Sequence, residues 1–140
     1  MIYELAIYEK APQEVVTTAD EIRAALFATE SKTEALICEI AGKIAGYAVF
    51  FTSYSTWLGR NGIYMEDLYI SPDYRGKGAG KTLLKTIARY AVDRQCDRLE
   101  WSVLDWNQPA IDFYLSMGAV AQSEWVHYRL SDEALLNFAG

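Results

Sequence analysis

The spacing of hydrophobic residues changes along the chain in a way that separates helices from strands. Five runs read as strands, because their apolar positions alternate or form short continuous stretches. Stretches with apolar residues three or four apart read as amphipathic helices. The predicted elements are helices at Met1–Lys10 and Thr18–Leu26, strands at Ala35–Ile40, Lys43–Tyr54 and Ile63–Ser71, a helix over Leu83–Val92, a strand at Arg98–Leu104, a helix from Pro109 to before Gly118, a strand at Ala119–Leu130 and a helix after Ser131. This order predicts an α+β, or mixed α/β, domain with helices on both faces of a sheet.

Short sequence signals support some of these boundaries. Thr18 followed three residues later by Glu21 matches a capping box at the start of the second helix. Ala41-Gly42 separates the first two strand runs and predicts a hairpin. The polar, glycine-containing segment Ser55–Gly62 predicts a loop before the third strand.

Length and composition restrict the class of protein. The chain has 140 residues, 51% of them hydrophobic, which favours one domain, 1–140, that folds without a disulfide or metal. Cys38 and Cys96 form no CxxC pair and His127 is the single histidine, so no metal site is expected. No apolar run approaches the roughly 20 residues of a membrane span. We therefore expect a cytoplasmic protein with no membrane partner.

Charge is distributed unevenly. The chain carries 13 basic and 19 acidic residues, and its net charge of −6 argues against a nucleic-acid partner. The stretch Tyr74–Arg98, however, has seven basic and two acidic residues. Such a patch in an acidic chain indicates an anionic ligand at one place and a cationic one elsewhere. A solvated helix face explains the patch equally well on charge alone.

A glycine-rich loop follows the third strand run and precedes the long amphipathic helix. Glycines at positions 76, 78 and 80 allow the backbone to approach a ligand closely, and the following helix N-terminus favours anions. Phosphate binding is the natural use, and a turn without a ligand is the alternative. The spacing matches neither the Walker loop nor the dinucleotide-binding fingerprint.

These residues resemble a known family. The run Arg75–Gly80, after a strand and a Ser-Pro-Asp-Tyr turn, resembles the R/Q-x-x-G-x-G/A signature of the GNAT superfamily of N-acetyltransferases. Residues 64–70 and 106–114 and the pair Tyr8-Glu9 are similar to stretches of diamine (spermidine/spermine) N-acetyltransferases. The resemblance covers nearly the whole chain. It implies the GNAT fold, with a central, mostly antiparallel sheet flanked by helices, here without the usual first strand, and a homodimer.

The resemblance also implies the site. Acetyl-CoA is the implied acetyl donor, and a small-molecule amine is the implied partner. Implied cofactor-binding residues are Leu68, Tyr69, Ile70, Arg75, Gly76, Lys77, Gly78, Ala79, Gly80, Lys81, Asn107 and Ala110. Implied substrate-binding residues are Tyr8, Glu9, Trp57, Glu66 and Asp67. The implied catalytic pair is Glu66, which assists removal of the amine proton directly or through water, and Tyr114, which protonates the leaving thiolate.

Acetylation of an amine requires residues of these types. An alkylammonium has a pKa near about 10, so a base or desolvation must help to produce the neutral nucleophile. Backbone N–H groups on residues 68–70 could serve the developing oxyanion. Without the family, Tyr114 is an ordinary packed aromatic, Glu66-Asp67 an exposed strand pair, and Trp57 part of a sheet core.

The sequence therefore predicts an N-acetyltransferase acting on a primary amine of a small diamine-like or lysine-like molecule through a ternary complex. A protein or peptide N-acetyltransferase and a non-catalytic acyl-CoA binding module are the alternatives. The diamine enzymes carry an acid shortly before the tryptophan that matches Trp57, whereas this chain has Ser55 there. We therefore expect a short diamine or a lysine-like amino acid rather than a long polyamine.

Overall fold

The computed structural model describes residues 1–140 and has an α+β architecture. Its helices are α1 (Ile2–Tyr8), α2 (Ala19–Phe27), α3 (Ala79–Asp93), α4 (Gln108–Ser116) and α5 (Asp132–Ala139), with short 3-10 turns η1 (Pro12–Glu14) and η2 (Pro72–Tyr74). Its strands are β1 (Thr33–Ile40), β2 (Lys43–Ser55), β3 (Arg60–Ile70) and β4 (Leu99–Trp101). The chain divides into two compact units, Met1–Leu104 and Asp105–Gly140.

The first unit contains one mixed sheet in the order β1-β2-β3-β4. The pairs β1-β2 and β2-β3 are antiparallel and β3-β4 is parallel, which confirms the prediction of a mostly antiparallel sheet. Ala41 and Gly42 form the predicted hairpin turn, both with positive φ (51° and 76°). Two successive positive φ angles are the geometry that lets a tight turn follow the twist of the strands. Helices, and no strand, precede β1.

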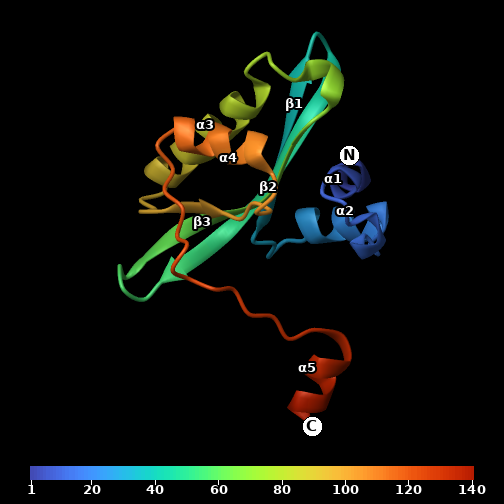
Figure 1. The fold of residues 1–140 in the computed structure, drawn as a ribbon, viewed down its shortest axis with the longest axis vertical. Helices are drawn as coiled ribbons and strands as arrows, with labels where there is room; N and C mark the ends of the chain where they lie inside the picture. Colours follow the sequence, from blue (N-terminus) through green and yellow to red (C-terminus); the bar gives the residue numbers. More distant parts are fainter. The chain divides into compact units, whose positions relative to one another are not determined.

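Helices lie on both faces of this sheet, as predicted. Helix α3 buries Leu83, Leu84 and Ile87, and the Phe50 ring of β2 lies 6.1 Å from the Tyr90 ring of α3. Neighbouring residues of a strand point to opposite faces. Figure 1 shows α1 and α2 on the other side of β1–β3 from α3. The sheet therefore presents one face to α3 and the other to α1.

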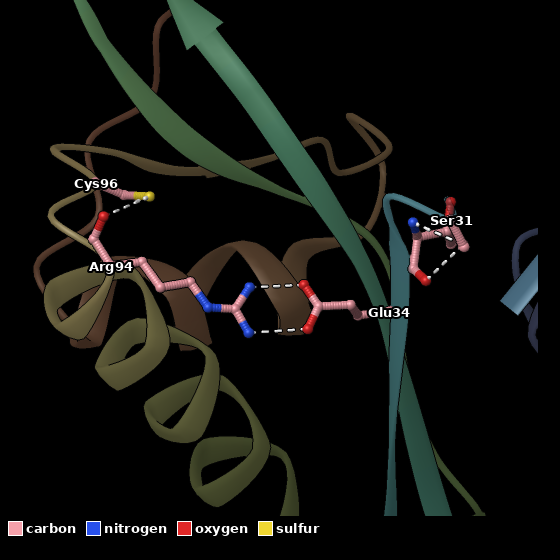
Figure 2. Close-up of polar contacts among 5 residues, drawn as sticks. Ser31, Glu34, Arg94 and Cys96 are labelled. Atoms are coloured by element: carbon pink, nitrogen blue, oxygen red, sulfur yellow. Dashed lines mark hydrogen bonds and ion pairs between the residues drawn. The ribbon is translucent and has the colours of Figure 1, made fainter. Parts of the chain in front are cut away.

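A bidentate ion pair connects the end of α3 to β1. The Arg94 guanidinium donates to both Glu34 carboxylate oxygens, at 2.6 and 2.8 Å, as Figure 2 shows. Arg94 also lies over the Tyr90 ring, 5.1 Å from its centroid. The arginine holds the pKa of the Glu34 carboxyl below its ordinary value. Planar, two-point pairing of this kind is stronger and more specific in geometry than a single hydrogen bond.

Three sequence predictions need correction or adjustment. Strands β2 and β3 take up residues 55 and 60–62 of the predicted loop 55–62, and the turn itself occupies residues 56–59. The strand predicted at 98–104 is limited to Leu99–Trp101. The strand predicted at 119–130 is wrong, since these residues are turn and irregular backbone. A strand needs a partner for its backbone hydrogen bonds, and the second unit contains only α4 and α5.

The helical predictions are confirmed. Thr18 and Glu21 form both hydrogen bonds of the capping box at the start of α2. Asn107 is the N-cap residue of α4, and Gly118 follows the end of that helix with a φ of 89°. Ser131 is the N-cap residue of α5. None of the helices combines the length and the apolar character that a membrane span requires.

Candidate functional site

The loop between β3 and α3 presents unpaired backbone N–H groups. Gly76 and Gly78 have φ angles of 76° and 82°, which glycine adopts without steric cost. A Cβ added to either would meet no heavy atom within 4 Å. Gly78 is the N-cap of α3, and its carbonyl accepts from the Thr82 N–H at 3.0 Å. The N–H groups of residues 79–81 therefore have no partner inside the helix.

This loop has the chemistry of a phosphate site. Unpaired N–H groups at the positive end of a 15-residue helix favour an anion. Lys77 and Lys81 are exposed beside them, and the Lys77 ammonium lies 5.8 Å from the centre of the Tyr74 ring. The residues at this loop therefore fit the pyrophosphate of acetyl-CoA.

Arg75, at the start of this loop, is engaged with the sheet and α1. Its Nε donates to the Ile70 carbonyl at 2.8 Å. Its guanidinium carbon lies 5.3 Å from the centre of the Tyr8 ring and 5.5 Å from that of Tyr69. The structure thus directs the Arg75 side chain toward the end of β3 and α1, while its backbone leads into the glycines.

A β-bulge lies at Glu66. In the β2-β3 ladder Val49 pairs with Asp67 and Phe50 pairs with Met65, so Glu66 has no partner in the register. A bulge of this type bends the strand and changes the direction of its side chains. Glu66 is exposed. The bulge therefore presents Glu66 at the middle of β3.

Beyond the bulge, one edge of β3 has no strand beside it. The parallel ladder with β4 ends where Met65 pairs with Trp101, whereas β3 continues to Ile70. Residues 68–70 pair with β2 on their other edge. Backbone groups of residues 68–70 that point away from β2 thus lie outside any ladder, at the positions where an oxyanion donor was expected.

Two carboxyl groups meet on the sheet face that carries α1. Asp67 and Tyr47 lie on the same face, because the β2 partner of Asp67 is Val49, two residues after Tyr47. The Tyr47 hydroxyl donates to Asp67 Oδ2 at 3.1 Å. Glu9 follows the end of α1 and is half-buried. Neither Glu9 nor Asp67 forms an ion pair with a lysine or arginine.

Burial raises the pKa of both carboxyls, and the charge of Asp67 raises that of Glu9 further. Removal from water raises the pKa of Asp67, and the Tyr47 hydrogen bond only partly opposes this effect. Burial and then the charge of Asp67 raise the pKa of Glu9. Burial and the neighbouring Asp67 also raise the pKa of the Tyr47 hydroxyl, so Tyr47 remains a hydrogen-bond donor. A nearby cation favours the charged form of a carboxyl and would oppose both shifts, so the pair is suited to bind an ammonium group.

Trp57 lies away from these carboxyls. It belongs to the β2-β3 turn at residues 56–59. That turn begins seven residues after Val49, the β2 partner of Asp67, which corresponds to roughly 23 Å along an extended strand. Ser55 stabilises the turn, since its hydroxyl accepts from the Leu58 N–H at 3.2 Å. Within this unit, Trp57 is not brought together with Glu9 and Asp67.

The remaining expected residues belong to the second unit. Asn107 caps α4, Ala110 lies in its first turn, and Tyr114 lies in its last turns, with its ring 5.5 Å from that of Phe113. The proline at position 109 fits the start of the helix because the N–H it lacks has no helical acceptor there.

A depression lies at the other end of α3 from the glycine loop. It has a volume of about 320 Å³ and is lined by Arg60, Asn61, Arg94 and Gln95. Arg94 is paired with Glu34, and Arg60 lies 3.4 Å from Asp97. A 15-residue helix is roughly 22 Å long, which separates this depression from the glycine loop. Its paired arginines leave little charge for a ligand.

Sequence reasoning missed Tyr47. A tyrosine in an apolar strand read as an ordinary core residue, yet a buried hydroxyl needs a partner. The side chain is 5% exposed, and its partner is Asp67, 20 residues away in the sequence. The sequence does show a tyrosine in one predicted strand and an aspartate in the next. Which of their residues face each other depends on the register of the two strands, and the sequence does not show that register.

Known proteins resemble this chain in sequence and in structure. The sequence model described as the acetyltransferase (GNAT) family matches residues 3–119. The thialysine N-epsilon-acetyltransferase of Bos taurus is 38% identical over 151 aligned positions, covering 100% of this chain and 88% of its own. The L-ornithine N5-acetyltransferase of Arabidopsis thaliana is 45% identical over 92 aligned positions, which cover 66% of this chain and 40% of that protein.

Among solved structures, an integron cassette protein from the mobile metagenome of V. cholerae superposes with a TM-score of 0.81. It is 28% identical, and the match covers 98% of this chain and 86% of that protein. The architecture of the chain is therefore shared along almost its whole length.

Proposed function

Because the chain belongs to the acetyltransferase (GNAT) family and is an N-acetyltransferase of that fold, we propose that it acetylates a primary amine of a small diamine-like or lysine-like molecule. Members of the family use acetyl-CoA as the acetyl donor. The observation that carries the choice of acceptor is the pair Glu9 and Asp67, two carboxyls with raised pKa values that form no ion pair with a lysine or arginine.

An acceptor with two amino groups can bring a positive charge to these two half-buried carboxyls and so offset the cost of burying their charges. One nitrogen reacts, while the other stays protonated and donates a hydrogen bond to a carboxylate. A hydrogen bond between charged groups contributes about 1.5 to 3 kcal/mol. The relatives named for thialysine and for ornithine act on amino acids that carry a side-chain amine, at Nε and N5 respectively. We propose the same class of acceptor for this chain.

The glycine loop supports binding of the donor. Residues 79–81 offer N–H groups to the pyrophosphate, and Lys77 and Lys81 offset its charge. When bound, acetyl-CoA supplies the activated acetyl group. Asn107 and Ala110 are further proposed contacts for the donor. Position 78 is decisive, because any side chain there occupies the open side of the loop.

The chemical step divides between two side chains in this proposal. The acceptor nitrogen attacks the thioester carbonyl carbon, and its proton passes to the exposed Glu66 directly or through one water. A backbone N–H of residues 68–70 donates to the carbonyl oxygen as its negative charge grows. The carbon–sulfur bond breaks, and the Tyr114 hydroxyl gives its proton to the thiolate. Tyr8 is a proposed acceptor contact, and Trp57 is left out of this site because its turn lies away from Glu9 and Asp67. We also propose that the enzyme acts in the cytoplasm as a homodimer.

A substrate panel tests the proposal. The purified chain is assayed for acetyl-CoA turnover with ornithine, lysine, putrescine, spermine, an aminoglycoside and a peptide with a free N-terminus. We expect ornithine, lysine or putrescine to give the highest kcat/KM. Preference for the peptide would support the peptide acetyltransferase instead. Binding of acetyl-CoA without turnover of any amine would support the non-catalytic binding module.

A further inference from the structure

A cation–aromatic cluster joins the glycine loop to α1. Arg75 directly precedes Gly76, and its guanidinium lies within 5.3 Å of the Tyr8 ring centre and 5.5 Å of the Tyr69 ring centre. The bond from its Nε to the Ile70 carbonyl fixes the plane of the guanidinium. Attraction of this kind holds a cation over an aromatic face. Arg75 therefore connects the loop, the end of β3 and the end of α1.

A second set of contacts continues from this cluster to the acceptor carboxyls. The Tyr69 ring lies 6.2 Å from the Tyr47 ring, and the Tyr47 hydroxyl donates to Asp67. The Tyr69 hydroxyl also interacts with the Glu4 carboxylate and with Arg75. Glu9 is adjacent to Tyr8 in the chain. The donor loop and both acceptor carboxyls are thus linked through one arginine.

Helix α1 depends on such contacts for its position. It has seven residues, none of them buried, and no side chain caps its first turn. A helix of this length is marginal without tertiary contacts. Since Glu9 follows its last turn, the position of Glu9 varies with that of α1. A group that fixes α1 therefore also fixes Glu9.

We propose that Arg75 is a positioning residue that couples the donor loop to the acceptor site, so that each ligand binds more tightly in the presence of the other. This inference rests on the proposed function. Phosphate groups bound to the N–H groups of residues 79–81 restrict the loop that Arg75 begins, and so favour the state in which Arg75 contacts Tyr8 and Tyr69. The ordered Arg75 holds Tyr8 and α1, and Glu9 is then in place for the ammonium of the acceptor. The coupling is reciprocal by thermodynamic linkage.

Calorimetry on the full chain tests the coupling. The affinity for L-ornithine is measured alone and with saturating CoA, which has no acetyl group and permits no turnover. We expect ornithine to bind at least about fivefold more tightly with CoA, the lower end of common coupling. Arg75→Gln should bring this ratio close to one and raise the ornithine KM more than it lowers kcat. Its Kd for CoA in the absence of ornithine should stay within about twofold of the parent value, because the side chain is placed away from the phosphates in this account.

Two further variants keep the test independent of folding defects. Tyr8→Phe retains the ring and should retain the ratio, whereas Tyr8→Leu removes the ring and should lose it. Arg89→Gln removes another exposed arginine of the first unit and should match the parent in both affinities. Each variant is first checked for an unchanged circular dichroism spectrum and melting temperature.

The outcomes separate this inference from the proposed function. A parent that binds CoA and ornithine, but whose Arg75→Gln variant keeps the full ratio, would overturn the coupling and leave the acetyltransferase proposal intact. A loss of CoA affinity in Arg75→Gln as large as that in Gly78→Val would show that Arg75 binds phosphate instead. A parent that binds no CoA would overturn both.

Discussion

Replacing Asp67 with asparagine removes its charge and retains its shape. The amide oxygen of the new side chain can still accept from the Tyr47 hydroxyl, now 3.1 Å from Asp67 Oδ2. What disappears is the charge that burial penalises and that raises the pKa of Glu9. The variant should therefore be more stable than the parent and less active, because the partly buried charge of Asp67 serves substrate binding and lowers the free energy of unfolding.

The pH dependence has a definite sign. The pKa of Asp67 is raised in the folded state, so the folded chain holds a proton that the unfolded chain releases. The free energy of unfolding of the parent therefore falls as pH rises from about 4, the ordinary aspartate value, through the raised folded pKa. The whole penalty is present once the pH exceeds that raised folded pKa. Asp67→Asn should gain about 0.5 to 2 kcal/mol there, the range of single stabilising changes, and the gain should vanish in acid.

Catalysis should change in the opposite direction. If the charge of Asp67 binds the second ammonium, its loss removes about 1.5 to 3 kcal/mol, or roughly 10- to 150-fold in kcat/KM for putrescine. The matched monoamine n-butylamine has no second ammonium and should lose little. Glu39→Gln is the control, since Glu39 is an exposed carboxylate on β1.

Urea unfolding between pH 4 and 8 and initial rates with both amines give the two readouts. Equal losses for putrescine and n-butylamine would show that Asp67 does not bind the second amine. A variant less stable than the parent at pH 7 would refute the account of its raised pKa.

Three further predictions test other parts of the molecule. Gly78→Val should weaken acetyl-CoA binding at least about 100-fold, from two lost phosphate contacts, whereas Gly42→Val carries a comparable left-handed strain of about 1 to 2 kcal/mol and should bind normally in calorimetry. Tyr114→Phe should lower kcat about 100-fold with unchanged acetyl-CoA affinity, and a loss within about threefold would mean that water protonates the thiolate. Glu34→Gln should cost roughly 0.5 to 1 kcal/mol at pH 7, since the pair is partly exposed. That difference should fade as pH drops through the lowered pKa of Glu34.

Several features of the fold follow from local sequence alone. The capping box of α2, the hairpin turn at Ala41-Gly42 and the amphipathic helix α3 each depend on residues close together in the chain. Their hydrogen bonds and dihedral preferences are satisfied within a few residues. The glycine loop belongs to the same class, because its positive φ angles and the helix that follows it are properties of one short segment. The family resemblance begins from that loop and extends to residues 64–70 and 106–114, and the fold it implied is confirmed.

Only the tertiary structure decided what depends on pairing across the chain. The segment 119–130 has the composition of a strand, but β structure requires a partner, and its own unit offers none. The bulge at Glu66 and the approach of Tyr47 to Asp67 result from the register of β3 against β2, which a one-residue shift would reverse. The direction of the Arg75 side chain depends on α1 from the opposite end of its unit. The sequence supplies these groups, while strand register and helix placement bring them within a few ångströms of one another.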